Sequence, residues 1–301
     1  MAGGEELRPA TRFLRAGNLS AEIAPVVGGG LARFDLTRAG RRESLLRPWP
    51  ESGTGDPNLL ACYPLLPWSN RLAAGGITLD GTFYRMPCLM PGEKLPIHGD
   101  GWRSPWQVAR ADKAAIVLEL RSRAMPPFDY MAELSYALSA SALTMALSLT
   151  HLGARPLAYG LGFHPWLPRT QGTVLEAPAD TVWLEDDDHL PTVRLDVAAR
   201  PEWNFRAPQP LPVSWINASF EGWDGNAMVR WPERNLALEM RASANLRRCI
   251  VYSPGPQADF FCFEPISHRI NAHAESNPEA AGLITLHPGD TVSCAVTLTP
   301  R

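Results

Sequence analysis

The feature that most limits the fold of this 301-residue sequence is a long series of short strand patterns separated by turn signals. Residues 19–23 alternate apolar and polar positions, and 29–38 follow as an expected partner strand. Residues 76–86 carry Asp-Gly between two β-prone runs, which is the strongest short-range signal for a hairpin. Further strands are predicted at 114–123, 130–140 and 142–152, and further hairpins at 227–243 and 282–300.

Helical periodicity is hard to find in the same sequence. The Ala-rich stretch 131–147 suits a helix by propensity, but its alternation of apolar and polar positions favours strands. The 29 prolines and 24 glycines are spread along the chain and are not concentrated in one linker, so no domain boundary is indicated. We therefore predict an all-β fold, one large antiparallel β-sandwich, built as a single domain over residues 1–301.

Charge and cysteine content exclude several classes of protein. The formal net charge of −3 gives no electrostatic basis for binding nucleic acid or an anionic membrane. The first twenty residues contain no apolar segment typical of a secretion signal, and no window approaches 18 apolar residues. The five cysteines are widely spaced and form no C-x-x-C pair, which favours reduced thiols over a zinc ribbon or a disulfide scaffold. These features together predict a cytoplasmic protein.

The run "FFCFEP" places a carboxylate directly after four apolar or aromatic residues. Burial of an unpaired carboxylate costs several kcal/mol, or else its pKa rises. Glu264 could therefore mark the point where a strand leaves the core and the side chain enters water. The alternative is a base held where a substrate will meet it. This stretch by itself favours the first interpretation.

Two loop segments place polar residues among apolar ones. Asn70 and Arg71 follow a loop rich in proline and aromatic residues, and the planar guanidinium of arginine suits hydroxyl or carboxylate recognition. An ordinary surface arginine is the simpler interpretation. His98 precedes a Gly-Asp-Gly turn, where a structural role is commoner than a catalytic one. No second histidine stands at the spacing of a metal site, so no metal ligand is predicted here.

Two later segments have a similar character. His164 lies among Gly, Phe, Pro and Trp, a setting that suits proton transfer near neutral pH. Asp224 follows Trp223, and in sugar sites an aromatic ring packs on the C–H face while a carboxylate binds hydroxyls. A plain Trp-Asp-Gly turn is the simpler interpretation of Asp224 taken alone. The acidic run at 185–189 is expected to be a solvated turn. The sequence shows no phosphate-binding loop and no nucleophile elbow.

Taken in order, these segments resemble the aldose 1-epimerase (galactose mutarotase) family. The resemblance rests on "WSNRLAAGGITLDG", "IHGDGW", "GFHPWLP", "GWDG", "SPGPQ" and "FEPISH", which together span about residues 60 to 270. It implies a large antiparallel β-sandwich of the galactose mutarotase type, a supersandwich with the sugar bound in an open cleft. It also implies a reaction that uses no metal and no nucleotide cofactor.

The resemblance assigns roles position by position. It implies that Glu264 is the general base and His164 the general acid of a reaction that interconverts the α and β anomers of a sugar. The base removes the C1 hydroxyl proton and the acid protonates the ring oxygen, so that the ring opens, rotates about C1–C2 and closes on its other face. The sugar-binding residues that it implies are Asn70, Arg71, His98, Asp224 and Gln257.

The expected ligand is a small sugar, a hexose or a hexose phosphate, bound by a monomer or a homodimer. A phosphate would call for basic residues near the cleft; Arg247 and Arg248 are candidates, but ordinary surface charges are the simpler interpretation of both. Only six residues separate Gln257 from Glu264, fewer than in galactose mutarotases, which argues against galactose itself. The alternative function is a non-catalytic carbohydrate-binding module that keeps the cleft. An accessory domain of a glycosidase would predict a second carboxylate in an apolar setting.

Overall fold

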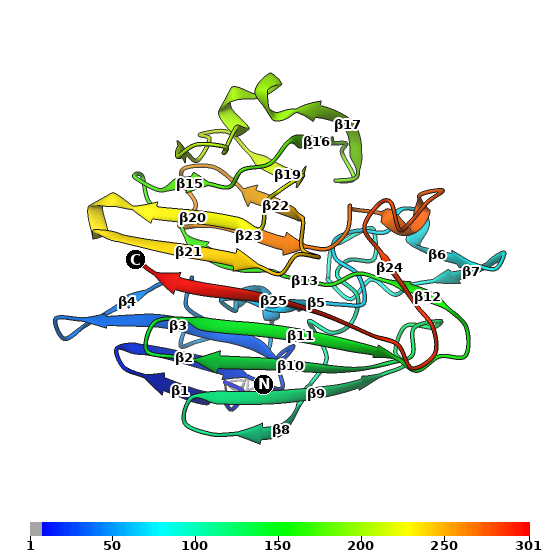
Figure 1. Ribbon diagram of the computed structural model, residues 1–301, viewed down its shortest axis with the longest axis horizontal. Helices are drawn as coiled ribbons and strands as arrows, with labels where there is room; N and C mark the ends of the chain where they lie inside the picture. Colours follow the sequence, from blue (N-terminus) through cyan, green and yellow to red (C-terminus); the bar gives the residue numbers. More distant parts are fainter. Residues whose placement is uncertain (1–7) are drawn as a thin grey trace, which may run out of the picture.

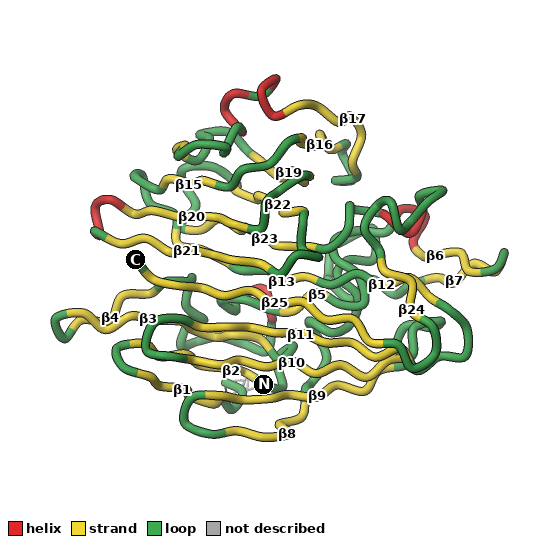
Figure 2. Tube along the Cα trace, viewed as in Figure 1, coloured by secondary structure: helices red, strands yellow, loops and turns green. Residues whose placement is uncertain are grey.

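The structure is a computed structural model that describes residues 8–301. The first seven residues of the N-terminal stretch, where the sequence shows no secretion signal, lie outside the described residues. Strands dominate the described chain, no α-helix occurs in residues 8–301, and the strand pairs there are antiparallel (Figures 1 and 2). The prediction of an all-β, antiparallel fold is confirmed. Short 3-10 helices lie at Pro57–Leu59, Ala73–Gly75, Val197–Ala199, Pro201–Trp203, Pro232–Arg234 and Ala272–Ala274.

The largest sheet has nine strands and runs across the molecule in Figure 1. In spatial order it consists of β18 (Gln209–Pro210), β15 (Val174–Glu176), β20 (Asn226–Trp231), β21 (Leu236–Ala242), β25 (Thr291–Pro300), β11 (Leu143–His151), β10 (Tyr130–Leu138), β9 (Ala115–Ser122) and β8 (Gln107–Ala111).

An eight-stranded sheet carries most of the residues that matter below. In spatial order it consists of β17 (Pro191–Asp196), β16 (Thr181–Glu185), β19 (Ile216–Glu221), β22 (Arg248–Ser253), β23 (Phe260–Ile266), β13 (Gly162–Phe163) and β5 (Pro64–Leu65), while β14 (Trp166–Pro168) also pairs with β23.

Three smaller sheets complete the fold. The N-terminal sheet contains β1 (Arg12–Ala16), β2 (Leu19–Ala24), β3 (Gly30–Arg38) and β4 (Arg41–Ser44); the two-stranded sheets pair β6 (Gly76–Leu79) with β7 (Thr82–Arg85) and β12 (Leu157–Tyr159) with β24 (Ile284–Leu286).

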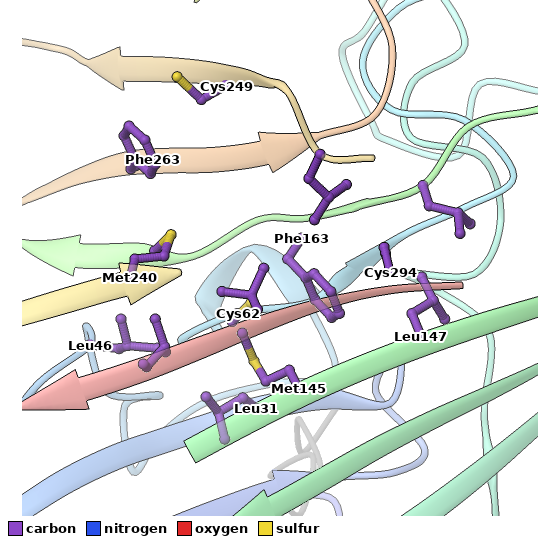
Figure 3. Packing of buried hydrophobic residues seen from close by; sticks show 14 of the residues in the cluster. Leu31, Leu46, Cys62, Met145, Leu147, Phe163, Met240, Cys249, Phe263 and Cys294 are labelled. Carbon is purple, nitrogen blue, oxygen red and sulfur yellow. The ribbon is translucent and has the colours of Figure 1, made fainter. Parts of the chain in front are cut away.

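One continuous hydrophobic core joins the two large sheets and the N-terminal sheet. Its members include Phe34 of the N-terminal sheet, Leu147 of the nine-stranded sheet and Phe263 of the eight-stranded sheet, and each is fully buried. Figure 3 shows side chains of this core, among them Leu147 and Phe263, between the strands. Such packing follows from strand alternation, because every second residue faces the core. All five cysteines are free thiols, and only Cys88 is exposed. Among the described residues, no helix is long and apolar enough to cross a membrane.

Most of the predicted hairpins are confirmed. The turn between β6 and β7 is Asp80-Gly81, and both residues have positive φ, as a two-residue hairpin turn of this type requires. The prediction of a closing hairpin over 282–300 is wrong in its pairing. Strands form at both places, but β24 pairs with β12 and β25 pairs with β11 and β21. Because both edges of β25 are already occupied, it has no edge left for β24.

Strand β23 explains how a carboxylate can follow an apolar run. Phe261 and Phe263 belong to the main core, whereas Cys262 lies on the opposite face of the sheet in a second apolar cluster. Glu264 shares that opposite face because it lies two residues after Cys262. The strand continues to Ile266, and only 3% of Glu264 is exposed. The interpretation that the strand leaves the core at Glu264 is therefore wrong.

Candidate active site

A cleft with a cavity volume of about 320 Å³ opens above the eight-stranded sheet, on the face that carries Glu264. Its lining comes from segments far apart in the sequence, which the sheet and the loops over it bring together. Among the residues singled out in the sequence, those that line the cleft are Asn70, Arg71, His98, His164 and Glu264.

The centre of the cleft is a contact between His164 and Glu264. The imidazole Nε2 lies 3.2 Å from Oε1 of the carboxyl group, and both side chains are more than nine-tenths buried. Burial raises the pKa of Glu264 to about 8, and the Arg71 guanidinium opposes this only in part. Burial also lowers the pKa of His164 to about 3, and the Arg47 guanidinium adds to this effect. Across neutral pH the pair therefore holds one proton between its two side chains.

Aromatic rings hold His164 in place. The imidazole is stacked between Tyr63, at a centroid distance of 4.6 Å, and Trp166, at 5.2 Å. The Arg47 guanidinium lies 3.8 Å from the centroid of the Trp166 ring. Planar groups stacked on both faces leave the imidazole little freedom to rotate, so Nε2 is fixed toward Glu264.

Backbone hydrogen bonds orient the loop that carries Asn70. The Asn70 N–H donates to Nδ1 of His98 at 3.0 Å, and the His98 N–H donates to the Asn70 carbonyl at 3.1 Å. Because Nδ1 accepts a hydrogen bond and burial lowers the pKa of His98, the proton of the neutral ring sits on Nε2. Oδ1 of Asn70 accepts from the Arg71 N–H at 2.9 Å, which leaves the amide nitrogen as a donor.

Arg71 lines the cleft and forms an ion pair with Glu93 through two hydrogen bonds. Its Nε and Nη2 donate to the two carboxylate oxygens of Glu93 at 3.1 and 2.8 Å. Such a pair fixes the plane of the guanidinium and balances its charge. Within residues 8–301, Nη1 of Arg71 makes no hydrogen bond, and a guanidinium has donors on all three nitrogens. Arg71 can therefore still donate to a ligand.

Several lining residues were missed in the sequence. Asn217 and Tyr252 share a register row with Cys262 across β19, β22 and β23, so the three side chains face the same side of the sheet. Strand alternation around Asn217 was the available signal, but only the pairing of distant strands reveals which residues meet. The other missed residues of the cleft wall are Asn58, Tyr63, Met90, Glu93, Ile97, Trp166, His189 and Trp215.

Two expected sugar ligands lie elsewhere. Asp224 is exposed in the turn between β19 and β20, where its Oδ1 accepts from the Asn226 N–H at 2.8 Å, and it lines a separate cavity. The simple Trp-Asp-Gly turn describes this arrangement. Gln257 is exposed in the turn between β22 and β23 and is not among the residues that line the cleft. The structure therefore brings neither side chain to the His164–Glu264 pair.

Two side chains that line the cleft and the buried thiol of Cys262 beside them have the geometry to approach a metal ion. Ligand atoms of His164, Cys262 and Glu264 all lie within 4.8 Å of one another. Burial raises the pKa of the Cys262 thiol well above its usual range, with the Glu264 carboxylate adding to this, so the thiol is held protonated. A metal would have to displace that proton, because thiolate is the ligating form.

Comparison with known proteins adds independent findings. The family model described as aldose 1-epimerase matches residues 13–299. The uncharacterized protein YphB of Escherichia coli K12 is 32% identical over 262 residues, which cover 84% of this chain and 88% of that protein. A candidate aldose 1-epimerase of known structure from Escherichia coli K12 superposes with a TM-score of 0.89 at 29% identity, covering 97% of this chain and 99% of that one. A galactose mutarotase-like protein from Clostridium acetobutylicum shares the fold, with a TM-score of 0.84 at 19% identity and 99% of each chain covered.

Proposed function

This chain belongs to the aldose 1-epimerase family, and we propose that it is an aldose 1-epimerase that interconverts the α and β anomers of a sugar by general acid–base catalysis. The observation that carries the proposal is the buried contact of 3.2 Å between His164 and Glu264 inside a cleft lined by hydrogen-bonding side chains. Ring opening needs one group that accepts a proton and one that donates a proton, and this pair supplies both.

The reaction begins with the single proton that the pair holds. Once this proton is on Nε2 of His164, the Glu264 carboxylate is free to accept the proton of the C1 hydroxyl. The C1–O5 bond then breaks, C1 becomes a carbonyl carbon, and Nε2 gives its proton to the ring oxygen. The pair again holds one proton, now on Glu264. After rotation about C1–C2, the same two transfers run in reverse and close the ring on its other face.

The surrounding residues suit the binding of a polyhydroxylated ring. Oε2 of Glu264 is buried and has no hydrogen-bond partner among residues 8–301, so a sugar hydroxyl would satisfy an acceptor that is otherwise costly to leave unpaired. Nε2–H of His98 and the amide nitrogen of Asn70 are available as donors. Arg71 would hold the sugar and stabilise negative charge on the ring oxygen as it forms.

The charges around the cleft support a neutral sugar in preference to a sugar phosphate. Arg71 is paired with Glu93, and Lys94 at the edge of the cleft is paired with Asp188 at 2.9 Å. Arg248, one of the basic residues considered for phosphate, donates instead to Glu221 at 2.9 Å and lies outside the cleft lining. A phosphate would therefore have to compete with a carboxylate for each of these cations.

Polarimetry of freshly dissolved α-D-glucose and α-D-galactose tests the proposal. We expect the wild-type protein to accelerate mutarotation of at least one sugar, and Glu264→Gln and His164→Asn to lower kcat/KM by about 100-fold or more. Glu133→Gln and His287→Asn, which change the same residue types outside the cleft, should retain the wild-type rate. Unchanged rates in the first two variants would overturn the mechanism. Sugar binding with no acceleration would favour the non-catalytic module.

A further inference from the structure

The far end of the cleft, away from His164, is organised by one carboxylate. Glu185, the last residue of β16, accepts hydrogen bonds from three side chains that line this end. Trp215 Nε1 donates to its Oε1 at 2.9 Å, and Asn217 Nδ2 donates to its Oε2 at 2.6 Å. His189 Nδ1 lies 2.8 Å from the same Oε2. We call Trp215, Asn217 and His189 the outer site.

These hydrogen bonds decide which atoms a ligand can meet. Because the amide nitrogen of Asn217 donates to Glu185, its Oδ1 is left as an acceptor. Because Nδ1 of His189 carries the proton that Glu185 accepts, Nε2 is the free ring nitrogen. The Trp215 ring is stacked on His189, packs edge-on against Tyr252 at 5.1 Å, and is 46% exposed. The outer site thus presents an open indole beside hydrogen-bonding atoms.

The outer site is offset from Glu264 by two strands of the sheet. Asn217 pairs with Tyr252, which pairs with Cys262 on β23. Two strand spacings separate β19 from β23, or about 10 Å, and Glu264 lies two residues further along β23. The residues at both ends of this offset line one cavity.

The chemistry of the outer site fits a sugar ring better than an anion. An indole face packs on the C–H face of a pyranose, and the Asn217 carbonyl oxygen accepts from a hydroxyl. Glu185 at its centre repels negative charge. The cation beside it, Lys94, is already paired with Asp188. A phosphate or carboxylate on the ligand would therefore be disfavoured here.

We propose that the outer site is a second sugar subsite, which binds the neighbouring ring of a reducing disaccharide whose free anomeric carbon lies at Glu264 and His164. Trp215 is the platform for this second ring, and Glu185 is a positioning residue that orients the platform and its two polar neighbours. The inference rests on the proposed function for the placement of the free anomeric carbon at Glu264 and His164. Binding of the second ring at the outer site can be measured without catalysis.

Calorimetric binding separates the subsite from catalysis. Maltose, cellobiose and lactose would each be titrated into the Glu264→Gln variant. Glucose and galactose would be titrated into the same variant for comparison. At least one disaccharide should bind about tenfold more tightly than its monosaccharide, and Trp215→Ala should remove that advantage by weakening disaccharide binding far more than monosaccharide binding. Phe83→Ala is the matched control, because Phe83 is equally exposed, at 46%, and lies on β7 outside the cleft.

Kinetics test the positioning role of Glu185. With Glu264 intact, Glu185→Ala should raise KM for the preferred disaccharide about tenfold at unchanged kcat, leave monosaccharide kinetics unchanged, and be partly rescued by Glu185→Gln. The inference is overturned if no disaccharide binds better than its monosaccharide, or if Trp215→Ala weakens both equally. A failure of the proposed function would give a different result. Disaccharides would still bind at the outer site, but the protein would turn over no sugar.

Discussion

At the scale of single residues, Glu264 is a carboxyl group kept where its charged form is unfavourable. Its pKa is raised to about 8 in the folded protein, against an ordinary value of 4.5. Between these pH values the folded chain binds a proton that the unfolded chain has released, so the free energy of unfolding falls as pH rises through this window. The proposed catalytic base therefore lowers the stability of the fold at alkaline pH.

Glu264→Gln removes this titration and should stabilise the protein while lowering its turnover. The difference in Tm between the variant and the wild type should be small near pH 4.5, grow through neutral pH and level off above pH 8. At pH 9 we expect the free energy of unfolding of the variant to exceed that of the wild type by about 1 kcal/mol or more. Each kcal/mol corresponds to a rise in Tm of about 2 to 4 °C for a chain of this size. Thermal melts from pH 4.5 to 9 measure it. A Tm difference that does not change with pH would contradict the assigned shift.

Residue patterns predicted the central pair but not the whole cleft. His164 and Glu264 could be identified because their immediate neighbours make a polar side chain conspicuous, and the ordered motifs resemble one family. Asn217 and Glu185 could not, because Asn217 has ordinary neighbours and the acidic run that begins at Glu185 predicted only a solvated turn. The significance of both residues comes from strands paired across the sheet. Asp224 shows the converse: an Asp next to a Trp suggested a sugar site, but a local turn accounts for it.

At the scale of elements, the turn from β12 to β13 supports the loop that carries Asn70 and Arg71. His268, just after β23, accepts a hydrogen bond at its Nε2 from the Ser69 N–H at 3.0 Å. The His268 ring packs directly against Gly160, where an added Cβ would lie 1.9 Å from Cδ2. Only glycine fits at this position because of this close approach.

Gly160→Ala should therefore displace His268 and loosen the loop at 69–71. We expect a loss of about 1 to 3 kcal/mol in the free energy of unfolding, as for other overpacked sites, together with a raised KM. Urea unfolding and polarimetry measure the two effects. Gly55→Ala is the matched control, since a Cβ there meets nothing within 4 Å and the residue has no positive φ. Equal behaviour of the two variants would show that His268 does not hold this loop.

At the scale of the whole molecule, local hairpins were predictable and long-range pairing was not. Alternation and an Asp-Gly turn are sufficient to predict β6 and β7, because the two strands are neighbours in sequence. Strand β25 looked like half of a terminal hairpin for the same reason. Its real partners are β11 and β21, and nothing in its own residues selects them. That choice depends on how the entire core closes.

Strand β25 joins the two parts of the nine-stranded sheet, with β11 on one edge and β21 on the other. Its inward residues Val296 and Leu298 are fully buried, so its removal opens the core and exposes two strand edges. A chain that ends at residue 290 should lose its cooperative thermal transition and its near-UV circular dichroism. A peptide of residues 291–301 added in trans should restore both in part, whereas deletion of Arg301 alone should change little. Cooperative melting of the truncated chain near the wild-type Tm would mean that the two parts of the sheet hold together without this strand.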